Sequence, residues 1–182
     1  MSVWHFTNVL ELTLQDHAEA HGHVLEHGCL IFNPNQKRLQ SHIPSGHHLV
    51  KRTAAWLVEH GFMYGRTCGN AVFLHSMPGC KQQQWHTDFD PVVVTRARKK
   101  PLGVVVALED DTFFETPSKT YHMAHGDIVI FEGDAVHAGS AYDVSNTRMH
   151  IYIDAAGCPR KNNRTYPIRK CSLAKKKRLP RS

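Results

Sequence analysis

The residues with the clearest chemical potential are His86, Asp88 and His137. His86 and Asp88 are two positions apart, so on an extended backbone both side chains leave the same face. His137 follows an apolar segment, 128–131, and a turn. Two imidazoles and one carboxylate on one face form the facial triad of non-haem Fe(II) sites, which leaves other coordination positions open. These three residues are therefore predicted to be catalytic metal ligands.

Arg148 lies eleven positions after His137 and is the second chemical signal. Residues 139–146 between them are rich in turn formers, and residues 147–154 alternate in a way that predicts a strand. An antiparallel return would bring Arg148 beside the metal ligands. Its guanidinium could then bind a carboxylate through two parallel hydrogen bonds.

These residues and their order resemble the Fe(II)/2-oxoglutarate-dependent dioxygenase superfamily, over about residues 71–154. In that superfamily a His-x-Asp pair and a distal His bind iron, and a basic residue further along the chain binds the far carboxylate of 2-oxoglutarate. The resemblance implies Fe(II), 2-oxoglutarate and O2 as cofactor and co-substrates, with ascorbate as an aid. It assigns the iron to His86, Asp88 and His137 and the acid to Arg148. The turn 78–84 resembles the superfamily's approach to the iron, and Gln83 or Tyr142 is expected to contact the bound acid.

The fold expected from the sequence is mainly β with supporting α-helices. With 182 residues and 41% hydrophobic side chains, the chain fits one globular domain. Helical patterns come first, and short strand patterns separated by Gly, Pro and Asp follow them. The predicted helices are 13–27 and 45–61, and the predicted strands are 71–76, 102–108, 112–115, 119–123, 127–131 and 148–154. This order favours an antiparallel two-sheet jelly roll, the cupin-like double-stranded β-helix.

Charge divides the chain into two parts. Residues 155–182 carry ten basic and no acidic side chains, which leaves 12 basic against 16 acidic residues in the remainder. We therefore expect a catalytic domain over 1–154, including the N-terminal helices, and a basic C-terminal extension over 155–182. Such a block can bind polyanions, and residues 175–178 resemble a nuclear-import patch, although a solvated tail explains the charge equally well.

The remaining features of composition point to an intracellular protein, cytoplasmic or nuclear. No leader is evident at the N-terminus, and no segment approaches the roughly 20 apolar residues of a membrane span. The five cysteines are odd in number and widely spaced, which favours reduced thiols over a disulfide framework.

Several other polar residues have competing interpretations. The first predicted helix carries His17, His21, His23 and His27, of which the first two are one turn apart, but without a zinc motif around them a solvated helix face is the better account. The basic residues of the segment 90–101 either face the substrate or form a solvated hairpin tip: Arg96, Arg98, Lys99 and Lys100. Three further histidines either line the barrel or, as the better account of each, are ordinary core or surface residues: His75, His122 and His150.

The leading functional hypothesis is a 2-oxoglutarate-dependent dioxygenase that hydroxylates a protein side chain and converts the co-substrate to succinate. A prolyl substrate is favoured because the compact size resembles small peptidyl prolyl hydroxylases. Collagen-type members use Lys as the anchor where this chain has Arg148. The alternative, an oxidative nucleic-acid demethylase or hydroxylase, is favoured by the basic tail, but Asp154 stands where AlkB-type enzymes carry a second Arg. A third interpretation is a non-catalytic cupin-like metal-binding module.

Overall fold

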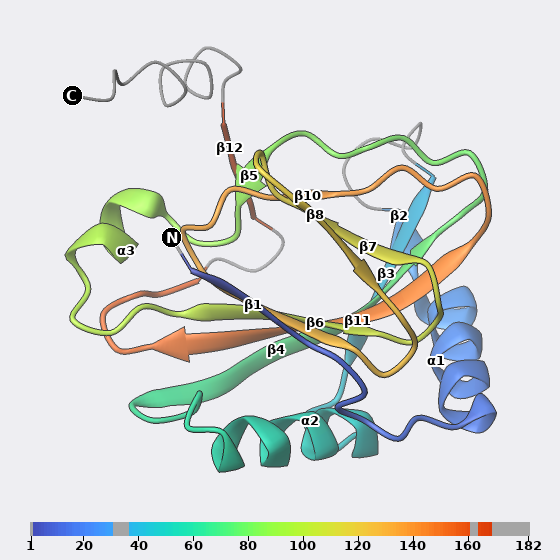
Figure 1. Ribbon diagram of the computed structural model, residues 1–182, viewed down its shortest axis with the longest axis horizontal. Helices are drawn as coiled ribbons and strands as arrows, with labels where there is room; N and C mark the ends of the chain where they lie inside the picture. The colour runs from blue at the N-terminus through green and yellow to red at the C-terminus, as the bar shows by residue number, and fades with distance from the viewer. Residues whose placement is uncertain (1, 31–36, 161–163, 169–182) are drawn as a thin grey trace.

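The computed structural model describes residues 2–30, 37–160 and 164–168 (Figure 1). Strands dominate this part of the chain, and none of its helices has the length and apolar character needed to cross a bilayer. The elements in chain order are β1 (Val3–Phe6), α1 (Leu14–His27), β2 (Cys29–Leu30), β3 (Arg38–Ile43), α2 (His48–Glu59), β4 (Arg66–Ser76), β5 (His86–Thr87), α3 (Pro91–Arg96), β6 (Leu102–Ala107), β7 (Thr112–Glu115), β8 (Thr120–Met123), β9 (Ile128–Glu132), β10 (Ala138–Gly139), β11 (Asn146–Ala155) and β12 (Tyr166–Pro167).

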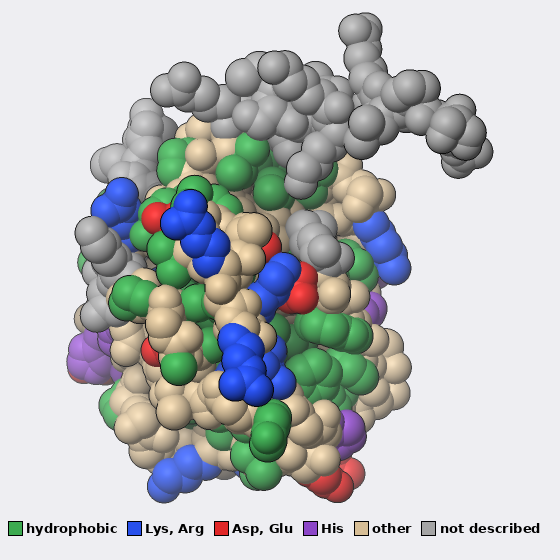
Figure 2. Space-filling view, turned by 90° about the vertical axis from the view of Figure 1, so that its left-hand side faces the viewer, with side chains coloured by type: hydrophobic (Ala, Val, Ile, Leu, Met, Phe, Trp, Pro, Cys, Tyr) green, Lys and Arg blue, Asp and Glu red, His purple; other side chains and the backbone are tan. Residues whose placement is uncertain are grey.

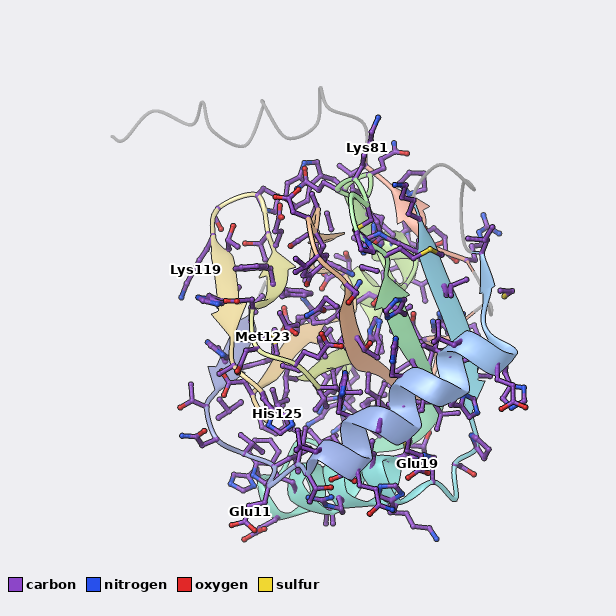
Figure 3. All side chains as sticks on the ribbon, turned by 90° about the vertical axis from the view of Figure 1, so that its right-hand side faces the viewer. Glu11, Glu19, Lys81, Lys119, Met123 and His125 are labelled. Carbon is purple, nitrogen blue, oxygen red and sulfur yellow. The ribbon has the colours of Figure 1, made fainter. Side chains whose placement is uncertain are left out.

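Two layers of antiparallel sheet make up the molecule. The large sheet has the strand order β1-β9-β6-β11-β4-β3-β2, and the facing layer consists of the sheets β10-β7-β8 and β12-β5. Figure 1 shows the short strands on one side of the large sheet and α2 on the other. Figure 3, viewed from the side of α1, shows this helix lying across the strands of the large sheet. The arrangement is the mainly β jelly roll that the sequence predicts.

Strand β11 determines which residues face the space between the layers. It pairs with β4 on one side and β6 on the other. Met149, Ile151 and Ile153 are fully buried and pack in one cluster with residues of α1 and α2. Because successive side chains of a strand point to opposite faces, Arg148 and His150 face the other layer. The strand thus carries core packing on one face and chemistry on the other.

Helix α1 begins at a capping box. Thr13 N–H donates to the Asp16 carboxylate at 2.7 Å, and Asp16 N–H donates to Thr13 Oγ1 at 3.1 Å. His48 Nε2 and Arg52 Nη1 lie 2.7 Å and 3.3 Å from the same carboxylate. Burial raises the pKa of Asp16, but these hydrogen bonds and the Arg52 charge outweigh it and lower the pKa from 3.8 to about 2. The carboxylate therefore connects the starts of α1 and α2.

Replacing this carboxylate is expected to weaken the fold in a pH-dependent way. The folded-state pKa of Asp16 lies below its ordinary value, so its stabilisation is present above about pH 4 and is lost as the pH falls towards 2. Asp16→Asn should lower the free energy of unfolding by about 1 kcal/mol at neutral pH. The difference from the parent protein should shrink near pH 3 in urea titrations. Glu26→Gln, an exposed change on the same helix, is the control, and a deficit that stays constant with pH would contradict the assignment.

The first half of the segment 90–101, for which a hairpin tip was one of the two interpretations, is the short helix α3. Asp90 accepts a hydrogen bond from Val92 N–H at 2.9 Å, and Pro91 occupies the first turn of α3. A short side chain that accepts a hydrogen bond at the N-cap, followed by proline at the first helical position, favours the start of a helix. The short helix places its Val94 in a small core with Val72 and Phe89.

Candidate metal and anion site

The three predicted metal ligands lie together between the two layers. His86 belongs to β5, Asp88 follows it closely, and His137 precedes β10. Two backbone hydrogen bonds join the histidines: His86 N–H donates to the His137 carbonyl at 3.0 Å, and His137 N–H donates back at 2.9 Å. One ligand atom of each of the three residues lies within 4.8 Å of the other two, and all three are buried. Main-chain pairing therefore holds the donor groups close together.

Both imidazoles are held in the tautomer that a metal requires. Nδ1 of His86 lies 2.7 Å from the Gln84 carbonyl, and Nδ1 of His137 lies 2.9 Å from the Ala135 carbonyl. A carbonyl oxygen can only accept, so the proton of each neutral ring is on Nδ1. The lone pair is then on Nε2, and the two Nε2 atoms lie 3.9 Å and 3.6 Å from Asp88 Oδ1.

The protonation states also suit a divalent cation. Burial, together with the neighbouring His137, lowers the pKa of His86 to about 4, and burial lowers that of His137, so both rings are neutral at neutral pH. Burial raises the pKa of Asp88, but His137 and His150 more than offset it and keep the carboxyl ionised. Because both rings are neutral, the buried carboxylate has no cationic partner in the triad, and an unpaired buried charge is unfavourable. The donor set therefore fits a bound metal ion.

His150 is a site residue that the sequence prediction missed. Its Nε2 lies 3.3 Å from Asp88 Oδ2, whereas the contacts of His86 and His137 are with Oδ1. The prediction of an ordinary core or surface histidine is wrong for this residue, whereas His75 is a buried partner of Thr147 and His122 is an exposed partner of Asp111. The sequence contained one indication of this role: His150 is two residues after Arg148 on a predicted strand, so both side chains lie on the same face.

Arg148 lines the same cavity as the metal ligands and is buried. Its Nη1 donates to Ser76 Oγ at 3.0 Å, and Nη1 of a second buried arginine, Arg38, donates to the same oxygen at 2.7 Å. Burial and the charge of Arg148 lower the pKa of Arg38 to about 10, so it stays protonated at neutral pH. Within the described ranges, neither arginine forms an ion pair with a carboxylate. Two buried positive charges beside one cavity favour an anionic ligand there.

Arg38 also connects two distant segments of the chain through hydrogen bonds to their backbone carbonyls. Its Nη2 donates to the carbonyls of Lys81 at 3.0 Å and Gly139 at 3.3 Å, and to that of Ser140. Sequence reasoning could not find this residue, because β3 lacks a clear apolar alternation and is far from the motif along the chain. Its role depends on the pairing of Arg38 with Ser76 in adjacent strands.

Solved structures with the same arrangement of strands share little sequence with this chain. No protein-family model matches the sequence, and no curated protein matches it. A viral collagen prolyl hydroxylase from Paramecium bursaria Chlorella virus-1, solved as a 2-oxoglutarate complex, is 13% identical with a TM-score of 0.61, covering 85% of this chain and 96% of its own. A Trichoplax adhaerens prolyl hydroxylase, bound to a peptide fragment of a hypoxia-inducible-factor degradation domain, is 10% identical with a TM-score of 0.58, covering 83% and 82%. The epimerase SnoN, in complex with Fe3+, α-ketoglutarate and nogalamycin RO, is 14% identical with a TM-score of 0.63, covering 88% and 82%.

The chain has the double-stranded β-helix fold of 2-oxoglutarate oxygenases. At these identities the likeness establishes the fold alone.

Only one of the two residues expected to contact the bound acid, Gln83 and Tyr142, lines the cavity. Gln83 lines the cavity, and its Oε1 accepts from Gly139 N–H at 3.0 Å. Tyr142 does not line the cavity; its hydroxyl accepts from Phe113 N–H at 2.9 Å, and its ring lies 5.6 Å from the Arg148 guanidinium carbon. Contact of Gln83 with a bound acid stays a prediction, and Tyr142 lies beside Arg148 instead.

Close packing connects the metal ligands to the core. A Cβ added at Gly103 would lie 2.2 Å from Phe131 Cζ, and the Phe131 ring is 4.6 Å from the ring of His137. Gly103→Ala should displace Phe131, lower the free energy of unfolding by about 1–3 kcal/mol and weaken metal binding. Gly46→Ala, at a position with open space around it, is the control. Equal unfolding midpoints for Gly103→Ala and the parent protein would contradict this account.

The basic residues of the segment 90–101 lie outside the cavity. Figure 2 shows Lys and Arg side chains gathered on the face that carries α3. Arg96 and Arg98 are exposed, whereas Lys100 pairs with Glu132 and Asp134 at 3.1 Å each. None of the four basic residues lines the cavity that contains the metal ligands, and Arg96 belongs to helix α3 and not to a hairpin tip. The patch at 175–178 lies outside the described residues.

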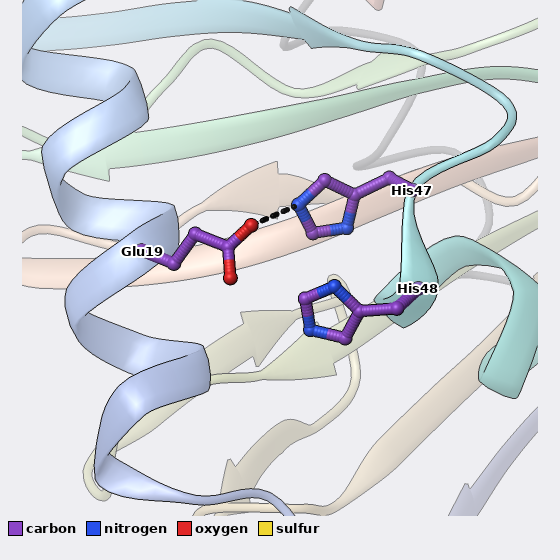
Figure 4. Close-up of side chains that lie close together, drawn as sticks. All are labelled: Glu19, His47 and His48. Atoms are coloured by element: carbon purple, nitrogen blue, oxygen red, sulfur yellow. Dashed lines mark ion pairs between the residues drawn. The ribbon is translucent and has the colours of Figure 1, made fainter.

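A second group with ligand atoms within 4.8 Å consists of Glu19, His47 and His48 (Figure 4). Its histidines already have structural partners. His47 Nδ1 accepts from Leu49 N–H at 3.2 Å, so its proton is on Nε2, which faces Glu19 at 3.3 Å. His48 Nε2 contacts the Asp16 carboxylate at 2.7 Å. A metal on His47 Nε2 would require the other tautomer and would remove the N-cap of α2, so these residues are assigned to the helix starts.

The histidines of α1 are not a solvated face throughout. His17 contacts Glu109 at 2.7 Å, and the His21 ring is 4.9 Å from that of His75 on the sheet. His23 contacts Ser41 at 3.0 Å, whereas His27 is exposed. Most of this row therefore packs against the large sheet, and none of it joins a metal-binding group among the described residues.

Proposed function

We propose that this protein is an Fe(II)- and 2-oxoglutarate-dependent dioxygenase that hydroxylates a prolyl side chain of a protein. One observation carries the proposal: the ligand atoms of His86, Asp88 and His137 converge in a cavity that Arg148 also lines. The fold shared with 2-oxoglutarate oxygenases supports it, because it places a metal and a dicarboxylate in the same kind of space.

The residues of the site have distinct proposed roles. His86, Asp88 and His137 would hold Fe(II), which when bound supplies the oxidative chemistry that no side chain can provide. His150 would keep the Asp88 carboxylate oriented through the oxygen that faces it. Arg148, with Ser76 and Arg38 behind it, would bind the far carboxylate of 2-oxoglutarate, where a charge-assisted bond in a buried place is stronger than in water. The apolar walls contributed by Leu74, Val105 and Phe114 would exclude water.

A prolyl substrate is the finer part of the proposal. Two of the three similar structures described above are prolyl hydroxylases, and one of them is bound to a peptide fragment. The nucleic-acid alternative depends on the basic extension, and among its ten basic residues the structure describes only Arg160 and Arg164. Arg160 has its guanidinium carbon 3.3 Å from the centre of the Tyr152 ring, so it packs on the domain.

The test is turnover of the co-substrate followed by a search for the product. The purified protein is incubated with Fe(II), ascorbate and 2-oxoglutarate, and succinate is measured with and without peptide and oligonucleotide libraries. A proline-containing peptide should stimulate succinate release and gain about 16 Da as one oxygen atom is inserted. Loss of a methyl group from an oligonucleotide would indicate an oxidative nucleic-acid demethylase instead. The absence of succinate with every library would indicate a non-catalytic metal-binding module.

A further inference from the structure

The C-terminal strand β12 pairs with the strand that carries a metal ligand. β12 runs antiparallel to β5, with Tyr166 opposite Thr87 and Pro167 opposite His86 (Figure 1). Ile168 N–H donates to the Trp85 carbonyl at 2.8 Å. Continuing the same register places Thr165 opposite Asp88, and Thr165 lines the cavity that contains the metal ligands and Arg148. A segment of the chain's own C-terminal extension therefore lies along one side of the site.

The geometry of β5 explains why an extended chain binds there. The backbone N–H and carbonyl of His86 are both used by His137 on one side. In an antiparallel strand the neighbouring residues direct their backbone groups to the other side, so Trp85 and Thr87 present theirs to β12. Without β12 these groups would form an open strand edge, and such an edge is a template for another extended segment.

The hydrogen-bond alternation also determines where a proline is accepted. Ile168 and Tyr166 occupy the positions that bond to β5, whereas Pro167 and Thr165 occupy the positions that do not. Pro167 already shows that a residue without an N–H fits the second kind of position. A proline in place of Thr165 would therefore cost no hydrogen bond to β5. Residues of such non-bonded pairs lie closest together, so its ring would stand directly beside Asp88.

We propose that the edge of β5 is the docking strand for a peptide substrate, and that residues 164–168 occupy it as a pseudosubstrate. The substrate pairs antiparallel with residues 85–87 and presents its reacting proline at the place of Thr165. A pairing as short as that of β12 is weak by itself, which allows a substrate to displace it. This inference rests on the proposed function for the identity of the reacting residue.

The test measures binding of a fluorescein-labelled peptide with the sequence of residues 160–170. It is titrated into the full chain and into a variant that ends at Arg160, which retains the packing of Arg160 on Tyr152. The shortened variant should bind the peptide at least about tenfold more tightly, because a tethered segment competes at a high effective concentration. Equal binding to both proteins, or binding to neither, would overturn the proposal.

A point variant covers the case in which the shortened chain does not fold. Ile168→Pro removes the N–H that donates to Trp85, whereas Ile168→Ala keeps it and serves as the matched control. The full chain with Ile168→Pro should bind the peptide, and that with Ile168→Ala should not. If both variants bind alike, the strand pairing does not hold the segment in place.

The register provides the sharpest readout. Peptides N-methylated at Tyr166 or Ile168 should lose binding, whereas a peptide with proline in place of Thr165 should keep it. If the peptide with proline in place of Thr165 lost binding as the N-methylated peptides do, the proposed register would be wrong. Displacement of the peptide by a single-stranded oligonucleotide would favour a nucleic-acid substrate. These binding assays need neither metal nor turnover. Peptide binding can therefore fail while succinate release succeeds, and succinate release can fail while peptide binding succeeds. The docking proposal and the proposed function are thus tested separately.

Discussion

Asp88→Ala and His86→Ala are each expected to abolish turnover. Asp88 is the one anionic group in the proposed donor set, and its Oδ1 is the atom on which both imidazole Nε2 atoms converge. Changes in residues that merely orient a metal ligand weaken metal binding by about 10–100-fold, so loss of a ligand should exceed that range. Titration with Co(II) or Ni(II) measures the effect directly, and succinate release measures its consequence.

The control for these variants is His122→Ala, which removes an exposed histidine on β8 that pairs with Asp111. It should bind metal and turn over 2-oxoglutarate as the parent protein does. If Asp88→Ala bound metal with unchanged affinity while its unfolding transition stayed intact, the metal site would have to be sought elsewhere in the chain.

The second large effect is expected from Arg148→Ala. The change removes a buried charge that lines the cavity and leaves the three metal ligands unaltered. A hydrogen bond to a charged group contributes about 1.5–3 kcal/mol, which corresponds to a roughly 10- to 150-fold rise in the 2-oxoglutarate concentration needed for half-maximal turnover. Metal affinity, measured by the same titration as for Asp88→Ala, should stay close to that of the parent protein.

A smaller acid separates the role of Arg148 from general damage to the cavity. Pyruvate has the 2-oxo acid group of 2-oxoglutarate but lacks the distal carboxylate, so its binding should be little affected by Arg148→Ala. Arg98→Ala, at an exposed position outside the cavity, is the matched control. Equal weakening of both acids would mean that Arg148 supports the cavity without anchoring the carboxylate.

Much of the fold was predictable because its elements depend on local patterns. The helices predicted at 13–27 and 45–61 are observed at Leu14–His27 and His48–Glu59, where a capping box and amphipathic spacing define them. The strand predicted at 102–108 is observed at Leu102–Ala107, a continuous apolar run buried on both faces. Among the elements that escaped prediction, β1, β2 and β3 are short or lack a regular apolar alternation, so nothing local distinguishes them from loops.

The site was predictable only where its residues lie in one motif. His86, Asp88, His137 and Arg148 occupy one stretch of chain, and the structure brings their side chains to one cavity. Arg38 enters through the pairing of β3 with β4, and Thr165 through the pairing of β12 with β5. Those contacts depend on strand register between distant segments, which spacing in the sequence does not encode.

The reciprocal backbone bonds between His86 and His137 have a consequence for how the protein responds to chelation. Because main-chain pairing joins the two segments, the donor groups are preorganised, and little conformational entropy remains to be lost when a cation binds. Removing the cation with EDTA should therefore leave a cooperatively folding protein. Its melting temperature should rise with added cation only as mass action requires, unlike zinc fingers, whose folding depends on their ion.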